Sequence, residues 1–465
     1  MKIVLINPRS RKPEEIQQKC FAPVNLLYLA SSLLRHGFDA EVIDANAFRL
    51  SDEAVALAAA RKQADLIGVP LMSETLMPAF HLIQCLESAC PRTTILTGGP
   101  HANAMPEAVL REFAAVDLVL TGECEDSLVR LCDALIRQTD IADIPGLCYR
   151  QGENIVHNPQ AAPISDLDGL PPPARHLLAE AYGSDKYYMI LEKQRPVETL
   201  LTSRGCPFRC AFCSNIPGPF RARSPENVVA EIVERYRSGI RNFDIADANF
   251  THDADRAMRI FDLIIREKMA ISFRFKTRTT AISRELVDKA GKAGAYLISM
   301  GMESGAQEIL GRMNKKTRID RNVEACKTVM AAGLKLNTGW IVGFPGETPD
   351  TIRQTVRLIL AVKPTTANIM RLIPYPETPV YEQARAENTL VGDWSVHGAF
   401  IPWIKLPWTE TLSDLEKATQ RVVNQVYLRP HYFVQFLGEV LKNANGPLAK
   451  YAFQEAGKAV GGLFR

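Results

Sequence analysis

The sequence predicts an α/β protein: a doubly wound parallel sheet at the N-terminus, a partial (β/α) barrel after it, and a small, mostly helical C-terminal region. Three observations predict this class. Short apolar runs alternate with helical patterns in both halves of the chain, polar or glycine-rich loops follow the apolar runs, and a proline-rich stretch separates the halves. At 465 residues the chain is too long for one hydrophobic core, which favours two or three domains.

The composition excludes several classes of protein. With 46% hydrophobic and 23% charged residues, the chain is typical of soluble globular proteins. The net charge of +3 is small, and no Lys/Arg cluster is dense enough to predict nucleic-acid binding. We find no apolar stretch long enough to span a membrane and no N-terminal hydrophobic segment. Ten cysteines without a secretory signal indicate a reducing compartment, so we expect a cytoplasmic protein.

Residues 1–140 predict a flavodoxin-like domain, because strands and helices alternate along them. The expected strands are Lys2–Ile6, Ala40–Asp44, Leu66–Val69, Thr94–Thr97 and Asp117–Leu120, and the expected helices are Leu26–Leu34, Asp52–Lys62 and Ala79–Ser88. Ligands of such a sheet bind beyond the carboxyl ends of its strands. The loops at those ends are polar or glycine-rich, and they begin at Asn7, Ser73, Gly98 and Thr121. No GxGxxG pattern is present, which disfavours a dinucleotide.

Residues 141–195 are expected to form a linker between domains. Ile144–Leu147 and Gly152-Glu153 predict a small hairpin, and a proline-rich stretch follows from Pro163 to Pro173. This composition is typical of an ordered connector.

Three cysteines stand within eight residues, at the spacing CxxxCxxC: Cys206, Cys210 and Cys213. They follow the apolar run Val197–Leu201, which predicts a buried strand, so the thiols lie on the loop at its carboxyl end. A structural zinc site normally has four ligands, and no His or Cys follows at the required spacing. Disulfides are disfavoured in a chain without a secretory signal. Three soft ligands without a fourth favour an iron–sulfur cluster that has one open iron.

Residues 196–385 predict a parallel barrel, complete or partial, whose chemistry lies at the carboxyl ends of the strands. The expected helices are Asn227–Ser238 and Asp255–Lys268, and the expected strands after the first are Asn242–Ile245, Phe273–Thr277, Tyr296–Met300, Leu336–Val342 and Ala367–Ile373. Polar or glycine-rich segments follow several of these strands: Asp247–Thr251, Gly301–Gly305 and Gly343–Glu347. Glu303 places a carboxylate beside flexible backbone, which suits the hydroxyl pair of a ribose.

Residues 386–465 are expected to form a helical region that faces the substrate. They contain Trp394, Trp403, Trp408 and a predicted helix over Leu412–Tyr427. The segment Tyr432–Leu441 is apolar on one side, and a helix that covers the barrel mouth is the favoured interpretation. Weak contact with a membrane surface is the alternative.

The cysteine motif, with Phe212 directly before the third cysteine, resembles that of the radical S-adenosylmethionine (SAM) superfamily. This resemblance implies a 4Fe–4S cluster whose open iron is chelated by the amine and carboxylate of SAM. The flavodoxin-like domain, the segment Pro23–Ala30 and the GGPHA and GECE loops ahead of the motif resemble the cobalamin-binding members. The resemblance runs from the N-terminus to about Glu382.

The resemblance also implies cofactor contacts. Contacts with cobalamin are implied for Asn7, Ser73, Glu74, Thr75, Gly98, Gly99, His101, Gly122 and Glu123. The DxHxxG motif of other cobalamin proteins is absent, so we expect no histidine on the lower face of cobalt, and His101 is expected to pack or to form hydrogen bonds.

Contacts with SAM are implied for Asp247, Asn249 and Thr251 (amino group), for Glu303 (ribose) and for Gly339, Ile341, Gly343 and Glu347 (adenine side). Ala248 departs from the family's DDNFT segment. Arg278 lies near SAM or the substrate by this resemblance, or forms a surface salt bridge.

By resemblance, the expected function is methylation of an unactivated carbon of a small molecule through a 5′-deoxyadenosyl radical and methylcobalamin. An external one-electron donor of the flavodoxin or ferredoxin type is implied. The alternative within enzymes is cyclisation or rearrangement with the same cofactors and no net methyl transfer. The alternative from another class is an iron–sulfur electron-transfer or sensor protein without turnover.

Overall fold

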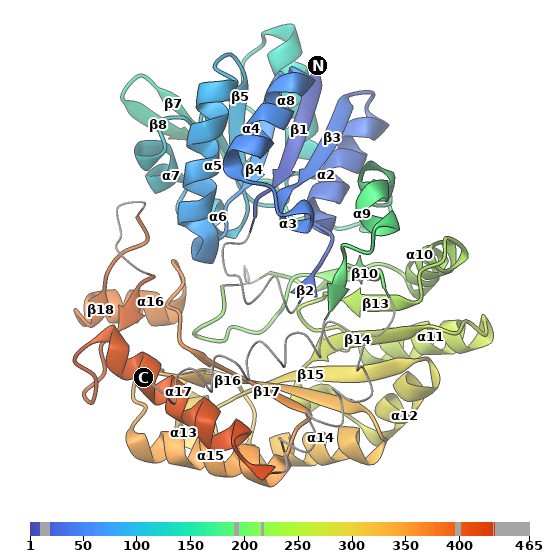
Figure 1. The fold of residues 1–465 in the computed structure, drawn as a ribbon, viewed down its shortest axis with the longest axis vertical. Helices are drawn as coiled ribbons and strands as arrows, with labels where there is room; N and C mark the ends of the chain where they lie inside the picture. Colours follow the sequence, from blue (N-terminus) through green and yellow to red (C-terminus); the bar gives the residue numbers. More distant parts are fainter. Residues whose placement is uncertain (10–18, 190–194, 215–217, 396–400, 431, 433–465) are drawn as a thin grey trace, which may run out of the picture.

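The computed structural model shows two α/β bodies stacked end to end, with the C-terminal elements beside the second (Figure 1). It describes residues 1–9, 19–189, 195–214, 218–395, 401–430 and 432. The N-terminal sheet points the carboxyl ends of its parallel strands toward the barrel (Figure 1). The loops predicted to bind cobalamin therefore lie at the junction of the two bodies.

The N-terminal sheet has the strand order β3-β1-β4-β5-β6-β7-β8. Its strands are β1 (Lys2–Asn7), β3 (Asp39–Asp44), β4 (Leu66–Pro70), β5 (Thr94–Gly98), β6 (Leu118–Leu120), β7 (Leu147–Gln151) and β8 (Asn154–His157). The first five in this order are parallel, in the 2-1-3-4-5 order of flavodoxin-like sheets. The predicted doubly wound sheet is confirmed.

Helices cover both faces of this sheet. The helices α2 (Val24–Arg35) and α8 (Glu125–Arg137) bury apolar side chains against one face. The other face is covered by α4 (Asp52–Lys62), α5 (Leu76–Ala89) and α7 (Pro106–Glu112). Helix α4 has the predicted bounds, because the Ser51 hydroxyl caps its first turn and Gln63 ends it in the left-handed conformation.

Two features differ from the sequence-based expectation. The short helix α6 (Pro100–Ala104) and α7 stand where only a loop was expected, each started by a proline in its first turn. The predicted hairpin is β7–β8, and β7 pairs antiparallel with β6. The hairpin therefore extends the N-terminal sheet, and the connector proper begins after His157.

The second sheet is an open, six-stranded parallel sheet in the order β10-β13-β14-β15-β16-β17, which confirms the partial barrel. Its strands are β10 (Val197–Leu200), β13 (Asn242–Ile245), β14 (Ser272–Thr277), β15 (Ala295–Glu303), β16 (Lys335–Val342) and β17 (Thr366–Arg371). The outer helices are α10 (Pro225–Arg237), α11 (Ala254–Arg266), α12 (Arg284–Lys292), α14 (Ile319–Ala331) and α15 (Pro349–Val362). Phe261, Phe273 and Phe275 lie in the core between sheet and helices.

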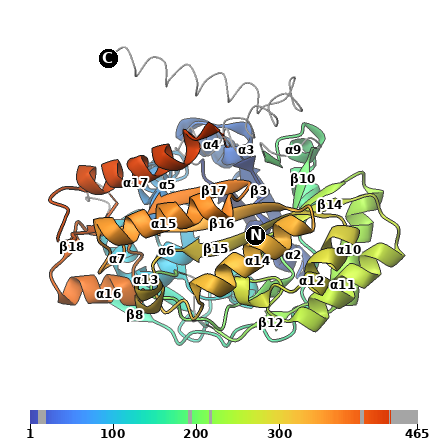
Figure 2. The same cartoon turned by 90° about the horizontal axis from the view of Figure 1, so that it is seen from below.

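The connector forms the 3-10 turn η2 (Arg175–Leu178), the helix α9 (Ala179–Gly183) and the short strand β9 (Tyr188–Met189), which pairs with β2 (Lys19–Cys20). After the barrel come α16 (Pro379–Ala386), the short pair β18 (Leu390–Val391) and β19 (Trp403–Ile404), and α17 (Leu412–Tyr427). Helix α17 has its predicted bounds and packs against β17 and α15 (Figures 1 and 2). The predicted segment 432–441 lies outside the described residues except for Tyr432. Among the described residues, no helix is long and apolar enough to cross a membrane.

Candidate functional site

The cysteine loop leaves the carboxyl end of β10 and is closed at its base by two short antiparallel strands, β11 (Ser203–Arg204) and β12 (Arg221–Ala222). Gly205 has a φ of 79°, and a Cβ there would collide with the carbonyl oxygen of Pro219, so only glycine fits this turn. The turn starts the loop that carries all three cysteines of the motif.

The three thiols are free, with Cys210 buried and Cys206 and Cys213 partly exposed. In the part of the chain that the structure describes, no three His, Cys, Asp or Glu side chains are arranged to hold a metal ion. The three thiols share one loop, and their ligation of the cluster stays a prediction. The donor set fits an iron–sulfur cluster, because it offers three soft ligands on one loop.

Hydrogen bonds to the backbone of this loop and from it connect the loop to the carboxyl end of the barrel. The Ala211 amide donates to the Met313 carbonyl at 2.9 Å, and the Val380 amide donates to the Ala211 carbonyl at 3.0 Å. The Asn314 side chain donates to the Arg209 carbonyl at 2.7 Å. The loop is therefore positioned by the segments that flank α13 (Gln307–Arg312) and α16.

Arg278, which follows β14, points at the cysteine loop. Its Nη1 donates to the Cys210 sulfur at 3.5 Å, its guanidinium carbon lies 3.9 Å from the ring centre of Phe208, and its Nη2 donates to the Lys315 carbonyl. The side chain is buried, and its Nε has no hydrogen-bond partner among the described residues. Arg278 is therefore buried against the cysteine loop rather than placed in a surface salt bridge, and its contact with SAM stays a prediction.

Glu303 lies at a β-bulge where β15 ends, with a φ of 63°. Its carboxylate lies beside Gly301 and forms an ion pair with Lys315 at 2.5 Å, and both side chains are buried. Glu303 is the last residue of β15, so this pair lies at the carboxyl end of the strand, where the ribose was predicted. Contact with SAM stays a prediction.

Asp247, Asn249 and Thr251 form hydrogen bonds with other residues of the protein. The buried Asp247 carboxylate accepts from the Thr202 amide (2.7 Å), the Thr202 hydroxyl (2.6 Å) and the Ser203 hydroxyl (2.6 Å). Burial raises the pKa of Asp247, and these hydrogen bonds oppose that rise. Asn249 and Thr251 both contact the Thr277 hydroxyl. Asp247 thereby positions the residues just before the cysteine loop, and its predicted contact with the SAM amino group is untested.

The segment 339–347 consists of the end of β16 and the turn that follows it at residues 343–347. The Gly343 amide donates to Glu347 Oε2 at 2.6 Å, and Glu347 Oε1 is buried without a partner among the described residues. Burial raises the pKa of Glu347 to about 7. A Cβ at Gly339 would meet only the Gly301 Cα at 3.8 Å, which leaves a flat backbone surface where an adenine was predicted. Ile341 belongs to the apolar cluster against which Phe212 of the cysteine loop packs.

The inner face of the barrel carries a polar row that the sequence analysis did not single out. Phe275, Met300 and Leu336 point into the outer core, so their neighbours along each strand point inward. In register with one another, the row consists of Lys276, Ser299, Asn337 and Thr366. The alternation of these polar residues with core residues along each strand could have indicated, from the sequence alone, that they face the inside of the barrel.

Ser299, Asn337 and Thr366 form hydrogen bonds with one another, whereas Lys276 is exposed. Asn337 donates to Ser299 at 3.3 Å and accepts from Thr366 at 2.8 Å. Lys276 is exposed, yet desolvation by its surroundings lowers its pKa. This combination fits a side chain on the inner face of the barrel, which is open to solvent and still surrounded by protein.

The loops predicted to bind cobalamin meet the C-terminal elements. The Ser73 hydroxyl and His101 Nδ1 lie 3.0 Å apart, and the Tyr375 hydroxyl donates to Glu74 of the 3-10 turn η1 (Ser73–Thr75). The His101 ring is 1% exposed and packs edge-on against Trp394, and burial lowers its pKa to about 4. The structure thus places His101 in the hydrogen-bonding and packing role.

The remaining predicted cobalamin residues divide between packing and exposure. Asn7 donates to Asp44 at 2.8 Å. A Cβ at Gly98 or Gly99 would lie only about 3 Å from a neighbouring carbonyl oxygen, and the φ of 90° at Gly99 also favours glycine. Gly122, with a φ of 84°, has open space beside it and suits a ligand. Glu123 instead pairs with arginines of the other body.

Comparison with known proteins matches the two bodies to two families. The B12 binding domain matches residues 18–132, and the radical SAM superfamily matches residues 200–359. An uncharacterized methyltransferase, PH0819, of Pyrococcus horikoshii is 27% identical over 98% of this chain and 99% of its own. The anaerobic magnesium-protoporphyrin IX monomethyl ester cyclase of Cereibacter sphaeroides is 27% identical over 93% of this chain and 71% of its own.

Among solved structures, the fold is similar to that of the radical SAM methyltransferase TsrM from Kitasatospora setae, solved with cobalamin and a [4Fe-4S] cluster. The TM-score is 0.75 at 18% identity, and the match covers 92% of this chain and 90% of that one. At this identity the similarity supports the fold: both bodies and their stacking.

Proposed function

Because this chain belongs to the cobalamin-binding radical SAM enzymes, we propose that it methylates an unactivated carbon of a small molecule. When bound, the cofactors supply a 5′-deoxyadenosyl radical, which removes a hydrogen atom, and a methyl group carried on cobalt. The observation that carries the proposal is that the loop predicted to hold the cluster lies next to the loops predicted to bind cobalamin. The cysteine loop and the loops after β4, β5 and β6 lie at one junction, held together by the Arg204–Glu125 ion pair at 2.5 Å.

In this proposal the protein's residues bind and orient. Cys206, Cys210 and Cys213 would hold three irons of the cluster, and Arg278 would orient the Cys210 sulfur through its hydrogen bond. Glu303 would hold the ribose of SAM, with Lys315 fixing its carboxylate.

The substrate would lie over the inner face of the barrel. Lys276 and the exposed Asn368 of β17 reach this space, which supports a small molecule with an anionic or hydrogen-bonding group. An external flavodoxin- or ferredoxin-type protein would supply the electron. We place the enzyme in the cytoplasm, because all ten cysteines are free thiols.

A second candidate function uses the same cofactors for cyclisation or rearrangement without net methyl transfer. The similarity to the magnesium-protoporphyrin cyclase over 93% of this chain favours it. The two functions differ in whether the methyl group of SAM leaves the enzyme on the product.

Anaerobic reconstitution with iron, sulfide, cobalamin and SAM, followed by product analysis, tests the proposal. Formation of both S-adenosylhomocysteine and 5′-deoxyadenosine supports methyl transfer. Formation of 5′-deoxyadenosine without S-adenosylhomocysteine supports the cyclase alternative. If an intact cluster yields neither product, the proposed function is wrong, and an electron-transfer or sensor protein is the better interpretation.

A further inference from the structure

The two strands that close the cysteine loop place two arginines opposite each other. Arg204 of β11 and Arg221 of β12 are register partners, one on each side of the loop. Like charges directly opposite in a strand pair destabilise it unless carboxylates neutralise them. The neutralising groups come from the other body of the protein.

Glu123, in the loop after β6, and Glu125, the first residue of α8, neutralise both arginines. The Glu123 carboxylate accepts from Arg221 Nη1 and Nη2, both at 2.8 Å, and lies 3.6 Å from Arg204 Nη1. The Glu125 carboxylate pairs with Arg204 Nη2 at 2.5 Å. Burial opposes ionisation of Glu123, but the hydrogen bonds from Arg221 and Ile164 outweigh it and lower its pKa.

The connector passes through the same contact. The Ile164 amide donates to Glu123 Oε2 at 2.8 Å, and the Ile164 carbonyl accepts from Arg221 Nη1 at 2.6 Å. The four charged side chains are between 6% and 22% exposed, so their charges are largely shielded from solvent. Pairs of this kind, with bidentate geometry and little exposure, hold their partners in a defined position.

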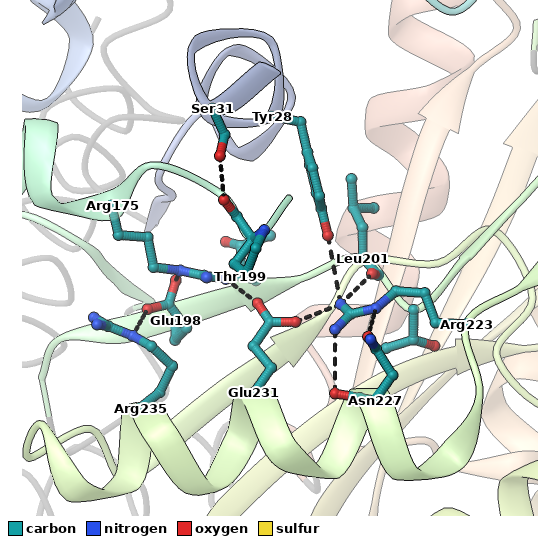
Figure 3. A network of polar contacts seen from close by, with 12 residues as sticks. Tyr28, Ser31, Arg175, Glu198, Thr199, Leu201, Arg223, Asn227, Glu231 and Arg235 are labelled. Carbon is teal, nitrogen blue, oxygen red and sulfur yellow. Dashed lines mark hydrogen bonds and ion pairs between the residues drawn. The ribbon is translucent and has the colours of Figure 1, made fainter. Parts of the chain in front are cut away.

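A second network joins the same two bodies (Figure 3), next to the first, because the Arg204 guanidinium carbon lies 5.5 Å from the ring centre of Tyr28. The hydroxyl of Tyr28, in α2, lies 3.4 Å from Arg223 Nη1, and Arg223 also donates to the Leu201 carbonyl at 3.1 Å. Arg223 pairs with Glu231, which also pairs with Arg175 of the connector at 2.5 Å. The backbone just before the cysteine loop is thereby tied to the N-terminal body twice.

We propose that Glu123 and Glu125 are positioning residues, which set the place of the iron–sulfur loop relative to the cobalamin-binding sheet. The proposal rests on the proposed function. It reassigns Glu123, for which contact with cobalamin was predicted: its carboxylate is already occupied by Arg221 and Ile164. Reactions that use two cofactors depend on such relative placement, since a misplacement of about 1 Å costs up to about 100-fold in rate.

The test uses the reconstituted holoenzyme and four variants: Glu123→Gln, Arg221→Gln, the double variant, and Glu107→Gln as control. Glu107 forms an exposed pair with Arg111 on α7, away from the junction. We measure iron content, 5′-deoxyadenosine and S-adenosylhomocysteine. Glu123→Gln is expected to keep its iron and its 5′-deoxyadenosine, whereas S-adenosylhomocysteine falls about tenfold, since methyl transfer needs both cofactors in register. The control is expected to match the wild type.

The double variant separates positioning from damage. If the two residues act as one pair, the double variant loses no more than either single variant, because the interaction is already broken. Amide hydrogen exchange at residues 203–206 and 219–222 gives a second readout that does not depend on turnover. Exchange there is expected to quicken in Glu123→Gln and to stay unchanged in the control.

Three outcomes would overturn the proposal. One is an unchanged product ratio in Glu123→Gln, the second is additive losses in the double variant, and the third is loss of both products in parallel with unchanged exchange. If the wild type forms no S-adenosylhomocysteine, the proposed methyl transfer itself fails. The exchange measurement then still decides whether Glu123 positions the loop.

Discussion

The hydroxyl of Tyr375 donates a hydrogen bond to the carboxylate of Glu74, a residue 301 positions earlier in the chain. Glu74 follows β4 of the N-terminal sheet, and Tyr375 follows β17 of the barrel. Trp394 stacks on Tyr375, with ring centres 6.0 Å apart and planes 6° apart, and also contacts His101. Tyr375 and Trp394 thus connect the segments that follow β17 to the N-terminal body.

Replacing Tyr375 with phenylalanine should weaken this connection. The ring and its stacking on Trp394 remain, but the hydrogen bond to the Glu74 carboxylate is lost, at a cost of about 1.5–3 kcal/mol for a bond to a charged group. We expect a lower unfolding temperature and weaker cobalamin binding, measured by thermal unfolding and by titration with hydroxocobalamin. Tyr149→Phe, on β7 away from the junction, is the control, and an equal effect there would contradict the prediction.

Replacing any one of Cys206, Cys210 or Cys213 with serine should abolish the iron–sulfur cluster. Serine is a much poorer ligand for iron than a thiolate, and no fourth cysteine lies within the motif to compensate. The expected iron content falls from about four per chain to near zero. Cys85→Ser, outside the motif, should keep its iron; retention of a full cluster in Cys210→Ser would exclude the proposed ligand set.

Much of the fold could be predicted from local pattern. Helix α17 has the predicted bounds Leu412–Tyr427, since Thr411 and Asp414 form a capping box that is visible in the sequence. The barrel strands carry runs of apolar residues, and glycines or carboxylates follow several of them, as after β15. These signals lie within a few residues of each element, so they can be recognised without knowing which distant residues the element contacts.

The remainder depends on contacts between distant residues. Nothing near Glu123 in the sequence identifies Arg221 as its partner, 98 positions away, and so the loop was assigned to cobalamin alone. Asp247 lies in the predicted segment, yet its carboxylate serves Thr202 and Ser203. The hairpin β7–β8 was expected, but only pairing with β6 shows that it belongs to the N-terminal sheet.

Replacing Glu303 with glutamine should weaken SAM binding. The carboxylate lies where the ribose was predicted, fixed by Lys315 at 2.5 Å, and the amide offers a weaker acceptor and leaves Lys315 without its ion pair. We expect about tenfold weaker binding, from a loss of about 1.5 kcal/mol, measured by anaerobic calorimetry with SAM. The exposed Glu308→Gln on α13 should bind normally, and an unchanged affinity in Glu303→Gln would exclude the ribose contact.

Bound cob(II)alamin should show no nitrogen splitting from a protein histidine. His101 is the histidine within the predicted cobalamin loops, but its ring is buried, with Nδ1 3.0 Å from the Ser73 hydroxyl. Electron paramagnetic resonance of the cob(II)alamin form is the measurement. A histidine splitting that vanishes in His101→Gln would show that His101 moves to ligate cobalt.

The pH dependence of stability should contain a contribution from Glu347. Its pKa is raised from 4.5 to about 7 by burial, so between these values the native state holds a proton that the unfolded chain has lost. The contribution of Glu347 to the free energy of unfolding is therefore largest below pH 4.5. It falls as the pH rises through 7, by at most about 3 kcal/mol. Glu347→Gln, which keeps an acceptor for the Gly343 amide, should be less sensitive to pH. Unfolding temperatures at about pH 5 and about pH 8.5 test this, because other groups cancel in the difference between wild type and variant. An equal pH response in both proteins would mean that Glu347 does not titrate in this range.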